Sequence, residues 1–143
     1  MGSVEPEDHI AILELLSRYS RCFDSGDVEG FAKLFTEDAS FETPVGNAAS
    51  RAEIETWARE RWVELRRDQI TPTHFQTNTL LRRDAADRAS GTTQLLLIWH
   101  HGKTNKSELT GTAIYEDEFR KTADGWRIAR RAIGWNSAPQ EEA

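Results

Sequence analysis

The chain has 143 residues, of which 38% are hydrophobic and 29% charged, and its formal net charge is −6. This composition excludes a disordered chain, and the length indicates one domain over residues 1–143, with its core in about residues 7–135. The basic residues are scattered, so we expect no nucleic-acid partner. No apolar run is long enough to span a bilayer, so we expect no membrane partner either.

Cysteine and histidine usage sets a further limit. Cys22 is the only cysteine, which excludes an intramolecular disulfide, and no cysteine–histidine set has the spacing of a zinc site. We therefore expect no metal and no cofactor. The acidic N-terminal stretch MGSVEPEDH lacks the apolar segment of a signal peptide, so we expect a cytoplasmic protein.

Helical periodicity predicts a first helix after Pro6, with Asp8 as its N-cap. The apolar stripe of this helix consists of Ile12, Leu15, Leu16, Tyr19, Cys22 and Phe23. In the sequence DSGD that follows, Gly26 is suited to end the helix and Asp27 to cap the next one. The second helix, VEGFAKLF, has its apolar residues on one side, and TEDASFET then predicts a turn and a short strand.

A third helix is predicted after the break at PVGN. Ser50 and Glu53 form a capping-box pattern at its start. Its apolar stripe consists of Ile54, Trp57, Ala58, Trp62 and Leu65.

The rest of the chain predicts a meander of long strands. The strand-like segments are residues 70–81, 92–101, 108–119 and 126–135. The segment TTQLLLIWHH is apolar on both faces and predicts a strand covered on both sides, and TADG predicts the last hairpin turn. Separate helices and an antiparallel meander indicate an α+β domain. The polar C-terminal tail NSAPQEEA is expected to be loose.

The first of these strands has an unusual face. Side chains alternate along a strand, so His74, Gln76 and Asn78 share one face, where a small domain normally has core residues. The alternation therefore raises the question of what these polar groups contact.

The order of these elements is typical of a known family. Together with YSRCFDSGDVEGFAKLFTEDASFE, THFQTN and GTAIYEDEFRKTADGWRIARR, it resembles the SnoaL-like family of the nuclear transport factor 2-like superfamily. The resemblance implies a cone-shaped α+β barrel, in which three N-terminal helices pack in a strongly curved, mostly antiparallel sheet with a deep apolar pocket. Members are commonly dimers, so we expect a homodimer. They include polyketide cyclases, scytalone dehydratase, the lindane dehydrochlorinase and steroid isomerases, and also non-catalytic proteins.

The resemblance also implies roles for the polar strand face, which looks into the pocket in this family. Dehydratase and dehydrochlorinase relatives use an aspartate after the first helix to orient a histidine on this strand. Asp24 and His74 match these positions, so His74 is the expected general base, and Gln76 or Asn78 is expected to bind a substrate oxygen. Without the resemblance, Asp24 is a turn-forming residue and His74 is a partly buried strand residue bonded to a threonine.

Two neighbouring arginines near the end of the chain must face opposite ways. Trp126 and Ile128 have the pattern of inward positions, which predicts that Arg130 faces inward and Arg131 outward. An inward arginine can neutralise a developing anion, and the dehydrochlorinase uses a late arginine in this way, so Arg130 is a catalytic candidate. The alternative is a surface ion pair with an acidic residue of the neighbouring strand.

Histidines and aromatic residues complete the expected pocket. By the same alternation, His101 rather than His100 faces inward beside Trp99, unless a bulge reverses the strand; the alternative is a strand-end histidine without a role. Aromatic walls suit a flat or polyunsaturated apolar substrate. The expected wall residues are Tyr19, Phe41, Trp57, Trp62, Trp99 and Tyr115.

These observations favour a cofactor-independent lyase, isomerase or cyclase that acts on a hydrophobic small molecule, such as a polyketide-type natural product. One alternative is a pericyclic cyclase that works mainly by folding a polyene in the pocket. The other is a non-catalytic binding or scaffold subunit, as in the partner subunits of ring-hydroxylating dioxygenases.

Overall fold

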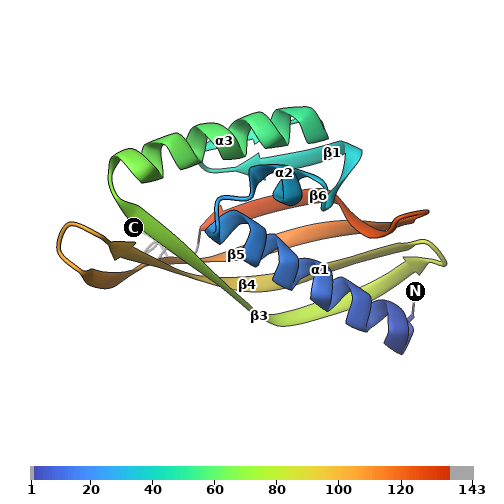
Figure 1. Cartoon of the computed structure of the whole chain (residues 1–143). Coiled ribbons are helices and arrows are strands. Elements are labelled where there is room, and N and C mark those ends of the chain that lie inside the picture. Colours follow the sequence, from blue (N-terminus) through green and yellow to red (C-terminus); the bar gives the residue numbers. More distant parts are fainter. Residues whose placement is uncertain (1, 136–143) are drawn as a thin grey trace, which may run out of the picture.

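The computed structural model describes residues 2–135, so the expected loose tail lies outside the described residues. Residues 2–135 form three helices and six strands (Figure 1). The helices are α1 (Pro6–Asp24), α2 (Val28–Ala32) and α3 (Arg51–Arg67). The strands are β1 (Phe35–Thr43), β2 (Gly46–Ala48), β3 (Ile70–Ala85), β4 (Arg88–His101), β5 (Lys106–Thr122) and β6 (Gly125–Trp135).

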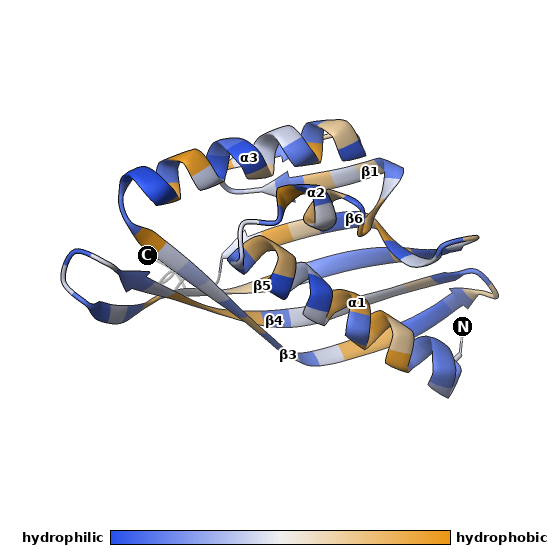
Figure 2. Ribbon diagram, viewed as in Figure 1, coloured by the Kyte–Doolittle hydropathy of each residue, from blue (hydrophilic) through white to orange (hydrophobic). Residues whose placement is uncertain are grey.

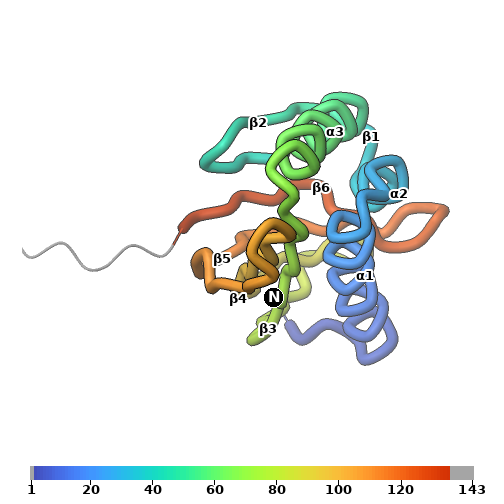
Figure 3. The backbone as a smooth tube through the Cα atoms, turned by 60° about the vertical axis from the view of Figure 1, so that its left-hand side comes forward, coloured from blue at the N-terminus to red at the C-terminus, as the bar shows by residue number. Residues whose placement is uncertain are grey.

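The strands form one mixed sheet in the order β2-β1-β6-β5-β4-β3. All neighbours are antiparallel except β1 and β6, which pair in parallel. The meander β3–β6 curves along α1 and α2, while α3 lies beside β1 and β2 (Figures 1 and 3). The predicted α+β architecture with a mostly antiparallel sheet is confirmed.

The start of α1 differs from the prediction. Glu5 is the N-cap and offers no side-chain cap bond, while Pro6 occupies the first helical turn, where its missing N–H costs nothing. The expected Asp8 cap is wrong. The Asp8 carboxylate instead accepts hydrogen bonds from Trp126 Nε1 at 2.9 Å and from Lys121 Nζ at 3.0 Å, and these bonds tie the helix start to the β5–β6 hairpin.

The other predicted helix signals are confirmed. Gly26 has φ 78°, a left-handed conformation that ends α1, and the Asp27 carboxylate accepts from Gly30 N at 2.9 Å to cap α2. Ser50 Oγ accepts from Glu53 N at 3.1 Å at the start of α3. The short DSGD connection therefore holds the end of α1 close to the start of α2.

The core lies between the helices and the inner face of the sheet. Apolar and polar stretches alternate along α1 and α3 (orange and blue in Figure 2), as expected for helices with one buried face. In β4, Leu95 and Leu97 are buried, but Leu96 and Ile98 on the other face are only half-buried. The expectation that both faces of this strand are covered is therefore not met within one chain. Among residues 2–135, no helix is both long and apolar enough to cross a membrane.

A β-bulge in β6 reverses the predicted orientation of the two arginines. Ile128 pairs with Phe119 and Arg130 pairs with Glu118, so Ala129 is an extra residue. Trp126 and Ile128 face inward as predicted, but beyond the bulge it is Arg131 that faces inward and is fully buried. The predicted inward Arg130 is wrong. Its guanidinium donates instead to Glu42 Oε2 at 2.9 Å in a half-exposed ion pair.

The inward arginine forms a bidentate ion pair across the β5–β6 ladder. Arg131 Nε and Nη2 each donate to one carboxylate oxygen of Asp117 at 2.7 Å, and both side chains are at most 1% exposed. Two charges removed from water require this near-ideal geometry to offset their lost hydration.

The two arginine pairs provide a matched test. Asp117→Asn leaves Arg131 buried without a counter-ion, so we expect it to lower the free energy of unfolding by about 3–5 kcal/mol. The double replacement Asp117→Leu/Arg131→Met should cost less than Asp117→Asn, because no uncompensated charge remains. Glu42→Gln removes only the exposed pair and should cost less than about 1 kcal/mol. Urea denaturation measures all three, and similar costs for Asp117→Asn and Glu42→Gln would contradict this assignment.

Candidate functional site

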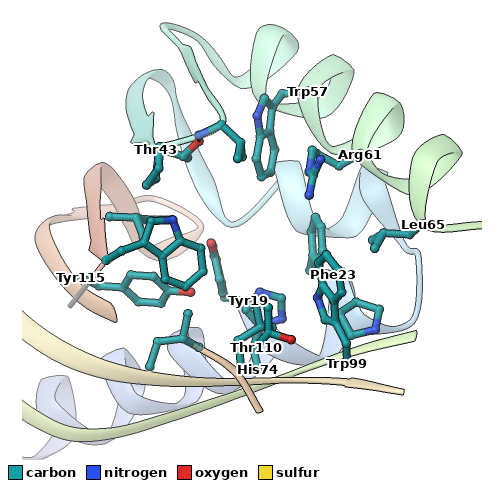
Figure 4. A pocket seen from close by; sticks show the side chains of 17 residues that line it. Tyr19, Phe23, Thr43, Trp57, Arg61, Leu65, His74, Trp99, Thr110 and Tyr115 are labelled. Atoms are coloured by element: carbon teal, nitrogen blue, oxygen red, sulfur yellow. The ribbon is translucent and has the colours of Figure 1, made fainter. Parts of the chain in front are cut away.

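An apolar pocket opens between α3, the end of α1 and the inner face of the sheet, with a cavity volume of about 230 Å³ (Figure 4). Its lining residues are Tyr19, Phe23, Thr43, Pro44, Val45, Trp57, Arg61, Leu65, Pro72, His74, Leu95, Leu97, Trp99, Thr110, Tyr115, Ile133 and Trp135. Val45 and Trp135 are 54% and 43% exposed and lie at its rim. This volume is below the range of about 300–1,000 Å³ that is common for drug-sized ligands, so the pocket suits a molecule of one or two rings.

The structure brings Asp24 into contact with His74, which lines this pocket, while Asp24 lies behind the lining. Asp24 is the last residue of α1, and His74 lies near the start of β3. One carboxylate oxygen accepts from the backbone N–H of His74 at 2.8 Å, and the other lies 2.5 Å from His74 Nδ1. The side chains of His74 and Asp24 are only 13% and 17% exposed.

This geometry assigns the imidazole tautomer. A carboxylate can only accept, so Nδ1 of His74 carries the hydrogen and Nε2 keeps a free lone pair. Phe23 and Tyr19 approach the imidazole edge-on, with ring centroids 5.3 and 6.5 Å away. The arrangement can accept a proton at Nε2 and stabilise the resulting imidazolium through Asp24.

Two buried tyrosines form another polar element of the pocket. Tyr19 and Tyr115 have ring centroids 5.9 Å apart, and the Arg131 guanidinium lies 4.2 and 3.9 Å from their ring centres. Burial raises the pKa of Tyr19, although the Arg131 charge opposes this shift. Burial, with the Tyr19 neighbour, raises the pKa of Tyr115 well above its ordinary value. Both hydroxyls are therefore neutral at neutral pH, and they share a hydrogen bond with each other.

The Arg131 guanidinium packs against the rings of both tyrosines. Burial opposes its charge, but the Asp117 carboxylate outweighs burial and raises the pKa of Arg131 above its ordinary value. Its Nη1 atom has no hydrogen-bond partner among the described residues, so the guanidinium interacts with the tyrosine rings through their π faces.

Part of the sequence-predicted site lies in the pocket. Tyr19, Trp57, Trp99 and Tyr115 line it, as does His74. The expected contacts that do not line it are Phe41, Trp62, Gln76, Asn78 and His101.

The two aromatic exceptions belong to the core. Phe41 is fully buried behind Trp57, with ring centroids 4.8 Å apart. Trp62 is also buried, and its Nε1 donates to the backbone oxygen of Phe23 at 2.7 Å. This bond anchors α3 to the end of α1 beside the dyad.

The three polar exceptions are engaged elsewhere. Gln76 Nε2 donates to Leu16 O at 2.7 Å and to Ser20 Oγ at 2.8 Å, which holds α1 against β3. Asn78 has φ 52° at an irregularity of β3 and donates to Gln94. His101 lies beyond the pocket, where its Nε2 is 2.7 Å from a carboxylate oxygen of Glu108.

The sequence analysis assigned no role to Arg61 and Thr110. Trp57, Arg61 and Leu65 are spaced by four residues on α3, so helical periodicity alone would have placed Arg61 on the pocket wall. Thr110 reaches the pocket because β5 has an extra residue opposite Leu97 and Ile98, and no sequence signal marks that bulge. In residues 2–135, no three histidine, cysteine or carboxylate side chains are grouped so that they could hold a metal ion.

Comparison with known families agrees with this fold and pocket. The sequence profile of the SnoaL-like domain matches residues 4–132. The chain belongs to the SnoaL-like family. No match to a curated protein sequence was found for this SnoaL-like protein.

Solved structures agree with the family assignment. One similar structure is an NTF2-like protein with a cystatin-like fold from Novosphingobium aromaticivorans, with a TM-score of 0.80, 24% identity and coverage of 94% of this chain and 85% of that one. ActVI-ORFA from Streptomyces coelicolor has a TM-score of 0.82, 21% identity and coverage of 91% and 96%. A proposed scytalone dehydratase from Novosphingobium aromaticivorans has a TM-score of 0.78, 20% identity and coverage of 94% and 88%. At these identities the likeness shows the fold alone.

The tyrosine environment predicts an unusual alkaline titration. Tyr19 and Tyr115 are the only two tyrosines of the chain, so tyrosinate absorbance reports on them alone. Because their folded pKa values are raised, we expect no tyrosinate signal from the folded protein at about pH 10, where the unfolded chain in guanidinium titrates. The neutral hydroxyls then contribute stability that is complete below about pH 10 and is lost as pH rises through the folded pKa values. A folded-state titration near pH 10 would contradict the burial of both hydroxyls.

Proposed function

We propose that this SnoaL-like protein is a cofactor-independent enzyme that abstracts a proton from a carbon atom next to a carbonyl group in a small hydrophobic substrate. The observation that carries the proposal is the contact of Asp24 with His74, a residue that lines an apolar pocket. His74 Nε2 is the general base, and Asp24 fixes its tautomer and orientation.

The proposed step moves one proton and one electron pair. Nε2 of His74 takes the proton, and the C–H electron pair shifts toward the carbonyl oxygen to form an enolate. Tyr19 and Tyr115 both line the pocket and share a hydrogen bond, so this pair can donate one further hydrogen bond to the oxygen. The enolate then expels a leaving group, takes the proton back at another carbon, or attacks an electrophilic carbon of the same molecule. These outcomes are elimination, isomerisation and ring closure.

The aromatic wall favours a second candidate. Trp57, Trp99 and Trp135 surround the cavity with flat apolar surface, which can hold a polyene in a reactive fold and so promote a pericyclic ring closure without a base. In that case replacement of His74 would slow the reaction only modestly. A pure scaffold role is less favoured, because such a protein gains nothing from a nearly buried histidine–aspartate pair.

Proton exchange from 2-tetralone tests the base directly. This bicyclic ketone is small enough for the cavity, and loss of its α-proton signals in D₂O is followed by NMR. We expect the wild-type protein to accelerate the exchange and His74→Gln to lower the protein-dependent rate by about 10²–10⁴-fold.

His100→Gln is the matched control for this experiment. His100 is the neighbouring strand-end histidine whose Nδ1 lies 3.0 Å from Ser107 Oγ, and it does not line the pocket. It should exchange 2-tetralone at the wild-type rate. If exchange is independent of His74, the general-base proposal is wrong and preorganisation becomes the better explanation.

Asp24→Asn tests the orienting role. An asparagine can keep both contacts only if its oxygen accepts from the backbone N–H of His74 and its amide donates to Nδ1. The hydrogen then resides on Nε2, so the base is blocked while the shape is kept. We expect the exchange rate to fall by about 10²–10⁴-fold, and ¹⁵N NMR to show the Nε2–H tautomer. A changed tautomer with an unchanged rate would rule out Nε2 as the base.

A further inference from the structure

The pocket wall formed by α3 contains one charged residue, Arg61, among apolar ones. Trp57, Arg61 and Leu65 follow one another at intervals of four residues and form one wall of the cavity (Figure 4). The lining residues one helical turn before and after Arg61 are the apolar Trp57 and Leu65, and the arginine side chain itself is only 28% exposed. A guanidinium suits such a wall better than an ammonium, because it is weakly hydrated and stays charged.

No carboxylate of the pocket lining neutralises this cation. The lining contains no aspartate or glutamate, and Asp24 and Asp117 behind it are engaged by His74 and Arg131. Among the described residues, the only hydrogen-bond partner of Arg61 is Glu64, which binds Nη1 from the half-exposed side of α3. The Nε and Nη2 groups of Arg61 remain able to donate to a ligand.

A second arginine of α3 shows what a structural arginine does here. The Arg66 guanidinium stacks on the Trp62 ring at 5.2 Å and does not line the pocket. Within residues 2–135 no aromatic ring stacks on Arg61 in this way, so stacking does not explain its position on the cavity wall.

We propose that Arg61 binds a carboxylate group of the substrate. This inference rests on the proposed function and deepens it, since it gives the substrate class as an aromatic or polyunsaturated carboxylic acid of one or two rings that also carries a carbonyl group. The planar carboxylate matches the guanidinium fork. Its apolar body lies between the aromatic walls, and its carbonyl end meets Tyr19, Tyr115 and His74, whose side chains lie across the cavity from Arg61 in Figure 4.

Isothermal titration calorimetry with a matched ligand pair tests this assignment. The probes are 2-naphthoate and 2-naphthamide, which differ only in the charged group. We expect the wild-type protein to bind 2-naphthoate at least about tenfold more tightly than 2-naphthamide, as one charge-assisted bond allows. Arg61→Gln should abolish this preference by weakening 2-naphthoate about tenfold and changing 2-naphthamide less than about twofold.

Arg66→Gln is the control, because it removes a positive charge from the same helix without touching the lining. It should keep the wild-type preference. Equal binding of the two probes by the wild-type protein, failure of both to bind at millimolar concentration, or an equal loss in Arg61→Gln and Arg66→Gln would overturn the proposal.

The same titration in His74→Gln separates the two proposals. Binding needs no chemistry, so this variant should keep the 2-naphthoate preference even if it no longer exchanges 2-tetralone. If the protein prefers 2-naphthoate but exchange does not depend on His74, Arg61 is still an anion-binding residue and the general-base proposal is wrong. If exchange depends on His74 but the protein does not prefer 2-naphthoate, the general-base proposal stands and the proposal of a carboxylate on the substrate is wrong.

Discussion

The bulge at Ala129 decides which arginine is inside the molecule, and much of the pocket depends on this choice. Beyond the bulge, Arg131 points inward and must find a counter-ion, which Asp117 supplies from the neighbouring strand. The ion pair then supports Tyr19 and Tyr115 from behind. The same change of alternation turns Ile133 and Trp135 toward the cavity. A single extra residue in β6 therefore determines both that Arg131 packs against the tyrosines and that Ile133 and Trp135 line the pocket.

The dyad depends on a second constraint, the short turn after α1. The helix ends at Asp24, the left-handed Gly26 follows two residues later, and the Asp24 carboxylate reaches His74 of β3. It accepts from both the backbone and the ring of His74, while Gln76, two residues further on the same face, bonds the backbone of α1. Part of the polar face of β3 thus packs against α1. His74 combines this structural contact with access to the cavity, and Gln76 has only the structural one.

Local signals in the sequence were sufficient for the α+β class, but not for strand β2, the parallel pairing of β1 with β6 or the interior of the site. The Gly26, Asp27 and Ser50 signals act within a few residues, so they predicted the helix ends correctly. Asp8 failed as a cap because a tryptophan 118 residues away, Trp126, binds its carboxylate. Arg130 failed because a bulge depends on pairing with two neighbouring strands, which alternation along one strand cannot reveal. The Asp24–His74 contact was expected only through the family resemblance, since 50 residues separate the two.

The charges around the cavity favour a particular kind of reaction. The proposed proton abstraction would place a positive charge on His74 beside Asp24 and a negative charge on the substrate oxygen. In a largely apolar cavity this separation is costly unless each new charge has a partner. In the proposed reaction Asp24 would stabilise the imidazolium, and a neutral tyrosine hydroxyl, held by an arginine whose own charge Asp117 balances, would stabilise the oxygen. A substrate that already carries a carboxylate would bring a second negative charge into the same space. Arg61 lies on the wall formed by α3, away from the dyad, so the two negative charges of the intermediate would have separate partners. If both proposals hold, each negative charge of the intermediate would have its own hydrogen-bond donor, and the two charges would not compete for the same groups.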